Sequence, residues 1–349
     1  MTKRVIAIFC LILFGSVSPA AERKLEPLPV AVSWNAVSAQ KVEKRLYLFS
    51  FMGIGEKKTW NAVTNRAFAL DTENGKWNEY RPVPGPAGRL AASAIAMREV
   101  VYLLGGYTLD AIGDETSVRS MEVLLPSRGI WYRGEEMPIP LDSTVIGVYR
   151  DRFLYTVAGR SQGNPVSTVQ VYDAEKNTWR QATTIPGTPV FGHAGAMMDD
   201  TIVYVDGARL NPAGDKPRYI PSDECWMGKI DHHDVSKIQW SKIPTHPGSA
   251  RFQIAATGSE KDHKIYFAGG ASKPFNHSGI AYEGGPVEPS AMLFAWNLKM
   301  GKWEIIMENT ADPVMANGGL LITREGFVRI GGMEAGQRVT SKVTVIPRK

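Results

Sequence analysis

One segment of the chain, residues 271–290 (ASKPFNHSGIAYEGGPVEPS), gathers side chains that could bind a sugar and move its protons. Tyr282 could serve as a stacking platform, and Glu283 as a hydrogen-bond acceptor or proton carrier. The prolines and glycines of the segment indicate a loop held in one shape. The alternative is that Phe275 and Tyr282 only anchor a long loop on its scaffold.

Arginines recur in segments that we expect on the same face of the molecule. A guanidinium grips a carboxylate through two parallel hydrogen bonds, so several converging arginines would indicate an acidic ligand. For any single arginine, a surface salt bridge is the competing explanation. The five are Arg89, Arg160, Arg209, Arg218 and Arg251. We favour Arg89 and Arg251, because we expect them to open the first strands of their repeated units, which would place them near the central axis.

His193, within FGHAGAM, occupies a similar position in another unit. Its imidazole could act as a general acid or base near neutral pH. The alternative is a histidine whose ring is satisfied by a loop carbonyl.

We expect neither a metal nor another cofactor. His232 and His233 are adjacent, so on a strand they point to opposite faces and cannot share an ion. Outside the first 20 residues Cys225 is the only cysteine, which excludes an internal disulfide there and argues against a copper radical oxidase, whose site needs a Tyr–Cys crosslink. The chain has no GxSxG, P-loop or dinucleotide fingerprint.

These residues are set in a repeated pattern of strands. An apolar strand ending in glycine recurs, for example at residues 100–106 (VVYLLGG) and 264–270 (KIYFAGG), and a second, alternating strand follows each copy. We interpret the paired glycines as allowing the innermost strands to crowd around an axis. Most units end in a turn and a tryptophan that should cover the space between neighbours. These are Trp77, Trp131, Trp179, Trp240 and Trp303.

Six copies predict an all-β, six-bladed β-propeller that forms one domain over residues 22–349. The last unit stops at its third strand. We expect the N-terminal residues 28–33 (LPVAVS) to supply the missing outer strand and so close the ring.

Residues 1–20 are typical of a cleaved signal peptide, with Lys3 and Arg4 before a short apolar run and small residues near position 20. We therefore expect an exported protein, periplasmic or extracellular, without membrane insertion. The formal net charge of +5 is spread along the chain, which argues against a nucleic-acid partner.

The repeated pattern resembles the kelch repeat over essentially all of residues 22–349, and VYDAEKNTW (171–179) is close to that family's consensus. In finer detail the chain resembles the N-acetylneuraminate epimerase (sialic-acid mutarotase) family. Shared features are FAGGA (267–271), the Tyr282-Glu283-Gly284 step, GKW (301–303), and Gly331-Gly332 followed by Glu334. A difference lies in the fourth unit, where Ala208 stands in place of the acid that these epimerases carry.

The resemblance implies a mutarotase that opens and recloses a sugar ring by general acid–base catalysis. Its proton carriers would be Glu283 and His193, and Arg89 and Arg251 would hold a substrate carboxylate. Arg209, Arg218, Tyr282 and Glu334 would complete the substrate-binding set. The alternative function is a non-catalytic propeller that binds a glycan or an exported protein partner.

Overall fold

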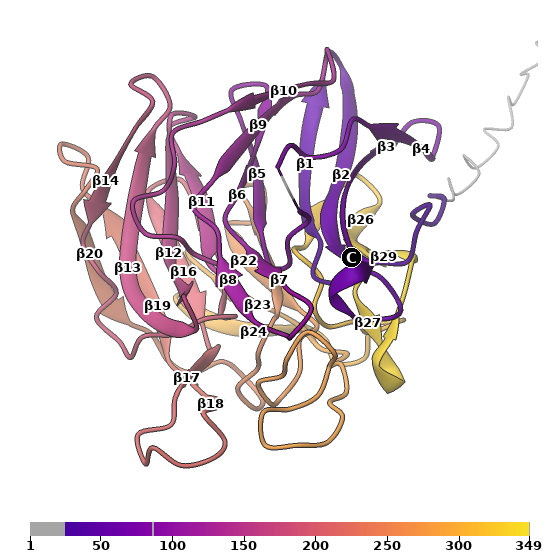
Figure 1. Ribbon diagram of the computed structural model, residues 1–349. Helices are drawn as coiled ribbons and strands as arrows, with labels where there is room; N and C mark the ends of the chain where they lie inside the picture. The colour runs from indigo at the N-terminus through magenta and orange to yellow at the C-terminus, as the bar shows by residue number, and fades with distance from the viewer. Residues whose placement is uncertain (1–24, 86, 349) are drawn as a thin grey trace, which may run out of the picture.

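The computed structural model describes residues 25–85 and 87–348, which form six antiparallel sheets arranged as the blades of a β-propeller (Figure 1). The predicted signal peptide lies outside these residues. None of the helices in the described part of the chain is long and apolar enough to cross a membrane.

Five blades have four strands each. Blade 1 comprises β1 (Ala36–Val42), β2 (Arg45–Ile54), β3 (Val63–Asp71) and β4 (Lys76–Tyr80), with the 3-10 helix η1 (Trp60–Ala62) before β3. Blade 2 comprises β5 (Ser93–Met97), β6 (Val100–Leu104), β9 (Met121–Leu125) and β10 (Ile130–Arg133). Blade 3 comprises β11 (Val145–Tyr149), β12 (Phe153–Ser161), β13 (Asn164–Asp173) and β14 (Thr178–Ala182). Blade 4 comprises β15 (Ala194–Met198), β16 (Thr201–Val205), β19 (Cys225–Ile230) and β20 (Ile238–Lys242). Blade 5 comprises β21 (Ala255–Ser259), β22 (Lys264–Ala268), β23 (Leu293–Asn297) and β24 (Lys302–Met307).

Blade 6 has three strands, β25 (Leu321–Ile322), β26 (Gly326–Ile330) and β29 (Val343–Pro347). Short strand pairs extend three blades on one face of the ring. They are β7 (Tyr107–Leu109) with β8 (Glu115–Ser117), β17 (Ala208–Leu210) with β18 (Tyr219–Pro221), and β27 (Met333–Glu334) with β28 (Arg338–Val339), the last pair joined by the 3-10 helix η2 (Ala335–Gln337).

The first strand of each blade lines the central axis. Neighbouring first strands contact one another all round the ring, from β1 to β5 and onward to β25, which meets β1. The strands that end in glycine are therefore second from the axis, and our expectation that they would be innermost is wrong. Small residues instead fill the first strands, as in AGAMM of β15 and AATGS of β21, because little room remains near the axis.

A ring of backbone hydrogen bonds joins the blades around the axis. Just before each first strand one residue adopts a left-handed conformation, with φ between 50° and 59°. These residues, which we call the axial ring, are Trp34, Ala91, Ser143, Gly192, Gln253 and Ala316. Five N–H groups of the ring each donate to the carbonyl of the ring residue in the preceding blade, at 2.7–3.1 Å. The bond from Trp34 N to Ala316 O connects blade 1 to blade 6.

The structure does not show the closing strand that we expected from residues 28–33. These residues add no strand to the sheet of blade 6, although three backbone hydrogen bonds join them to the sixth unit. They run from Leu28 N to Ser341 O (2.7 Å), from Val32 N to Thr340 O (3.2 Å) and from Gly332 N to Val32 O (2.8 Å). The Trp77 indole N–H donates to Glu26 O, as Trp131 donates to Arg81 O in the link between blades 1 and 2. The N-terminal segment therefore takes the place of an inter-blade link.

The repeated tryptophans lie on the outer strands β4, β10, β14, β20 and β24, as the pattern predicts. Each indole N–H donates to a backbone carbonyl of the link that precedes its blade, at 2.6–3.4 Å. Apolar clusters between the blades complete the core, such as the one that stacks Phe49 on Phe51 with Trp131 at its edge. Both the rings and their hydrogen bonds therefore hold blades together.

The glycines after the second strands allow the close approach of inter-blade links. Gly105 has φ +61°, and a Cβ there would lie 2.1 Å from Leu141 O. We expect Gly105→Ala to lower the free energy of unfolding by about 3 kcal/mol or more, because strain and a backbone clash add together. Gly113→Ala is the matched control, since Gly113 also has positive φ (+91°) but open space around it. Gly113→Ala should lower the free energy of unfolding by about 1 kcal/mol, as measured by urea unfolding. Equal losses in the two variants would contradict a clash at Gly105.

Candidate functional site

Three enlarged loops lie on one face of the ring, which we call the loop face. They carry the β7–β8 pair, the β17–β18 pair, and the long segment of residues 271–290, here named the blade 5 loop. Figure 1 shows them on the same side of the propeller, with the blade 5 loop in orange. This is the face on which the sequence predicts a ligand site.

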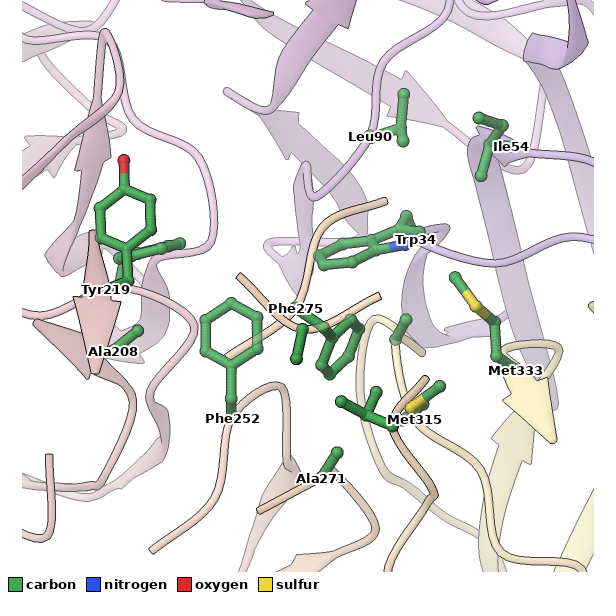
Figure 2. Packing of buried hydrophobic residues seen from close by; sticks show 14 of the residues in the cluster. Trp34, Ile54, Leu90, Ala208, Tyr219, Phe252, Ala271, Phe275, Met315 and Met333 are labelled. Carbon is green, nitrogen blue, oxygen red and sulfur yellow. The ribbon is translucent and has the colours of Figure 1, made fainter. Parts of the chain in front are cut away.

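The blade 5 loop fills the axial mouth on this face. Its Phe275 is fully buried and packs edge-on against Trp34 and Phe252, with ring centroids 5.6 and 5.2 Å apart. Figure 2 shows Phe275 among side chains that come from several blades. Ala281 and Val287 of the same loop are buried in this cluster. The loop is thus a plug over the mouth, anchored by Phe275 as the alternative interpretation expected.

Polar contacts fasten the plug to other blades. The Trp34 indole donates to His277 O at 3.1 Å, and Gln337 Nε2 donates to Val287 O at 2.6 Å. Lys58 Nζ donates to Ser278 O at 3.4 Å. Blades 1 and 6 therefore hold a loop that belongs to blade 5.

Little space remains beneath the plug. A cavity of about 10 Å³, lined by Trp34, Arg160, His277 and Tyr282 among others, has room for about one water molecule. On the other side of the axial ring, the first strands enclose a channel of about 470 Å³. Its described lining consists mainly of small and apolar residues and contains no Asp, Glu, Lys or Arg.

A cluster of charged side chains lies at the edge of the plug. Arg160, on β12, is buried and pairs with Asp142 (Nε to Oδ1, 3.0 Å) and with Glu115 (Nη1 to Oε2, 2.5 Å). Its guanidinium lies over the Tyr107 ring, 4.7 Å from the centroid. His277 Nδ1, from the blade 5 loop, is 3.6 Å from Glu115 Oε1. This cluster brings two acids, an arginine and a histidine together on the loop face.

Burial and charge act in opposite directions in this cluster. Burial raises the pKa of Asp142 above its ordinary value, although Arg160 favours the carboxylate. Burial also disfavours ionised Glu115, but His277 and Arg160 outweigh it and hold the pKa of Glu115 below its ordinary value. Burial raises the pKa of Tyr107 strongly. Arg160 is therefore already paired with two acids, Asp142 and Glu115, and is not a free cation for an acidic ligand.

The predicted proton carriers lie in different environments. Glu283 is exposed on the blade 5 loop and forms an ion pair with Lys273. His193 is buried, and its Nε2–H donates to Val157 O at 2.9 Å, while Nδ1 has no partner among the described residues. No hydrogen bond or ion pair in the described chain joins Glu283 to His193. Tyr282 lies edge-on to Tyr219, at 4.7 Å between centroids.

The buried His193 gives a pH-dependent stability. Burial lowers the pKa of His193 to about 4, from about 6.5 in the unfolded chain. Between these values the unfolded chain binds the proton more readily, so stability is retained above pH 6.5 and lost as the pH falls toward 4, by about 3 kcal/mol. Urea unfolding of wild type and His193→Gln across this range should show the loss only where the histidine is present. Parallel curves for the two proteins would contradict this prediction.

The predicted binding residues are dispersed. Arg89 is buried and forms an ion pair with Glu122, beside Ser120 Oγ at 2.9 Å. Arg218 is exposed and donates to Gly163 O at 3.1 Å. Glu334 is buried with Lys342 Nζ at 2.9 Å and also pairs with Arg338. Arg209 lines a groove between blades 4 and 5, and the Arg251 guanidinium lies next to Gly248 of the same groove.

Sequence reasoning missed Glu115, Asp142 and His277. One signal was available for Asp142. In every blade, the residue at this position forms an isolated β-bridge with the residue that follows the glycine of the second strand. The other blades have Ser33, Leu90, Phe191, Phe252 and Met315 there, so Asp142 is the one acid at this position. The residue bridged to Asp142 is Arg160, its ion-pair partner.

The described residues contain no group of three or more His, Cys, Asp or Glu side chains arranged to hold a metal ion. His232 contacts Asp200 (Nε2 to Oδ2, 3.1 Å) and Tyr149. Cys225 is buried, and burial raises the pKa of its thiol to about 12, so it carries a proton at neutral pH.

Comparison with known proteins places these features in context. The family model of the KLHDC2/KLHL20/DRC7 Kelch-repeats domain matches residues 36–270, well over half of the chain. Beta-scruin of Limulus polyphemus is 26% identical over 298 residues, which are 83% of this chain and 29% of that protein. Kelch-like protein terF of Aspergillus terreus is 24% identical over 233 residues, 64% of this chain and 49% of the relative. The chain thus spans less than half of either relative.

The solved structure of YjhT superimposes with a TM-score of 0.72, covering 93% of this chain and 97% of that one. Its sequence is 16% identical, so the likeness shows the fold alone.

Proposed function

Because this chain belongs to the kelch-repeat propellers, we propose that it is a non-catalytic binding propeller that docks a protein partner on its loop face. The observation that carries the proposal is the plug. Phe275 fills the axial mouth, and the cavity beneath it holds about one water molecule, so a sugar has no room at the centre of this face.

The environments of the predicted proton carriers also favour binding over catalysis. Ring opening needs two groups that reach one substrate, one to take a proton and one to give it. Glu283 is exposed and paired with Lys273, whereas His193 is buried and donates to a backbone carbonyl. Neither borders the small cavity beneath the plug.

Exposed apolar side chains support a protein partner over a glycan. Trp60, Ile112 and Leu210 are 51%, 83% and 44% exposed, and each belongs to a loop or strand pair of the loop face. Large exposed apolar residues that surround one face are typical of protein interaction sites. The two hairpins and the β2–β3 connection that carry them would contact the partner around the plugged mouth.

The test compares two triple variants in the cells that produce the protein. Trp60→Ser/Ile112→Ser/Leu210→Ser removes the apolar side chains of the loop face. Ile130→Ser/Tyr132→Ser/Ile305→Ser, on the outer strands β10 and β24, removes three other exposed apolar side chains, which are 40%, 51% and 47% exposed. With a photo-crosslinker at position 116 of β8, we expect one partner band with wild type and the outer-strand variant, and its loss in the loop-face variant. The same band from all three proteins, or none from wild type, would overturn the proposal.

A second candidate function is mutarotation of a sialic-acid-like sugar. It is favoured by the fifth-blade resemblance and by the Glu115, Arg160 and His277 cluster, which holds titratable groups at the edge of the mouth. The test mixes the protein with one pure anomer and follows re-equilibration by NMR. Acceleration that is lost in Glu283→Gln or Glu115→Gln would favour this function over the first. We expect the anomers to re-equilibrate at the same rate with the protein as without it.

We also propose export, which rests on residues 1–20 of the sequence alone. The measurement is the mass and location of the mature chain in cell fractions. A protein that keeps its first 20 residues inside the cell would refute export.

A further inference from the structure

The buried arginines differ in how their charge is neutralised. Arg89 and Arg160 are each paired with a carboxylate. Arg329 has no ion pair in the described chain; its Nη2 donates to two backbone carbonyls at 2.9 Å, while Nε and Nη1 have no partner there. Arg251 is equally buried, but its guanidinium contacts only the Met292 sulfur (3.4 Å) and the Phe294 ring (5.3 Å to the centroid). Its Nη1 has no partner in the described chain. A buried cation without an anion is costly unless a ligand or solvent supplies one.

The nearest acid is already engaged. Asp206 Oδ2 accepts the backbone N–H of Arg251 at 2.8 Å and lies 2.7 Å from His246 Nε2. His246 Nδ1 in turn lies 2.8 Å from Pro247 O. Asp206 Oδ2 is thus engaged by His246 and by the backbone of Arg251. No ion pair in the described chain joins Asp206 to the Arg251 guanidinium.

A surface groove lies beside this uncompensated charge. It has a volume of about 470 Å³ and is lined by Arg209, Pro221, Asp223, Thr245, Gly248, Ser249 and Ala250. Gly248 separates the groove from Arg251, since a Cβ at this position would lie 3.3 Å from Arg251 Nη2. The backbone N–H groups of residues 248–250 donate to no partner in the described chain. Arginines and free N–H groups on one groove are the donors that oxyanions use.

We propose that this groove between blades 4 and 5 binds a small hydroxylated oxyanion, held by Arg209 and the N–H groups of residues 248–250 and stabilised by the charge of Arg251 behind Gly248. The anionic group would supply the negative charge that no side chain of the described residues pairs with the Arg251 guanidinium. Asp223 lines the same groove, so the rest of the ligand should offer hydrogen-bond donors, as the hydroxyl groups of an acidic sugar do. The site is separate from the plugged axial mouth and does not depend on the proposed protein partner.

The test measures binding of four sugars of one size by NMR titration. Glucuronate, glucose 6-phosphate and glucose 6-sulfate carry a carboxylate, a phosphate and a sulfate group, and glucose is the neutral control. We expect saturable binding of at least one anion, with little binding of glucose and weaker affinity at high salt. Arg209→Gln should weaken that binding at least tenfold. Lys216→Gln is the matched control, because Lys216 is an exposed cation between β17 and β18 that lies outside the groove.

Arg251→Gln places an amide in a buried site and can prevent folding, so Gly248→Ala provides a second variant. Its added methyl group would lie 3.3 Å from Arg251 Nη2 and strain a backbone with φ +92°, so it should shift both the guanidinium and the N–H groups of residues 248–250 while leaving the charge in the chain. We expect it to weaken anion binding at least fivefold with an unchanged circular dichroism spectrum. Three outcomes would overturn the proposal. They are equal binding of glucose, no binding of any anion by wild type, and full binding by Arg209→Gln. None of them bears on partner crosslinking at the loop face.

Discussion

Replacing Arg160 with methionine is expected to lower the free energy of unfolding by about 3–5 kcal/mol. The substitution keeps much of the side-chain volume but leaves two carboxylates, on Asp142 and Glu115, without their cation. Asp142 is fully buried, so water cannot replace the lost partner. Urea unfolding at pH 7 measures the change. Arg66→Met is the matched control, because the Arg66 pair with Glu79 is exposed and should contribute about 0–1 kcal/mol.

A double variant separates a buried charge from lost packing. Adding Asp142→Leu to Arg160→Met removes the buried acid, so the double variant should be more stable than Arg160→Met alone. Glu115 keeps partial access to solvent and tolerates the change better. If the two substitutions instead add their losses, packing of the Arg160 guanidinium over the Tyr107 ring is the main contribution, and the account based on ion pairs is wrong.

The blade architecture could be predicted because each signature residue performs one local task in every copy. The outer-strand tryptophans repeat the same indole-to-carbonyl bond, so their spacing identifies the blades. The glycines do allow a close backbone approach, as the sequence predicts, but the backbone that approaches them is not at the central axis. They face the inter-blade links, as Gly105 faces Leu141 O, and do not line the axis. The small residues of β15 and β21 were the better indicator of the axis.

Residues 28–33 show why the closing strand could not be predicted. LPVAVS alternates like a strand, but a link can show the same pattern, and here Leu28 and Val32 are buried between blades 1 and 6 without joining a sheet. Periodicity alone does not distinguish the two cases. The hydrogen-bond partners distinguish them, since Glu26 receives a tryptophan indole as other links do.

The candidate site was the least predictable part. Residue types placed Tyr282 and Glu283 on a functional loop, but the path of a 20-residue loop depends on contacts with four other blades, which sequence periodicity does not encode. His277 reaches Glu115 of blade 2 only because Phe275 inserts over the axis. Likewise, the uncompensated charge of Arg251 follows from the bond between Asp206 and His246.

Phe275→Ala should open the axial mouth and lower the free energy of unfolding by about 3–5 kcal/mol, the usual cost of removing a fully buried phenylalanine. The loss arises because the ring contacts Trp34 and Phe252, which remain fixed in their blades. Urea unfolding gives the magnitude. Val287→Ala, in the same loop and also buried, is the control and should cost about 1–2 kcal/mol.

Hydrogen exchange on Phe275→Ala also discriminates between the two functions. If the plug is a permanent part of the scaffold, the amides of Trp34 and Gln253 in the axial ring should exchange faster, because the cluster that shields their bonds is weakened. If the plug instead covers a sugar site, the variant should gain sugar binding while exchange at the axial ring stays unchanged. We expect faster exchange and no sugar binding, because the groups beneath Phe275 are mainly aromatic rings and an arginine already paired with two acids.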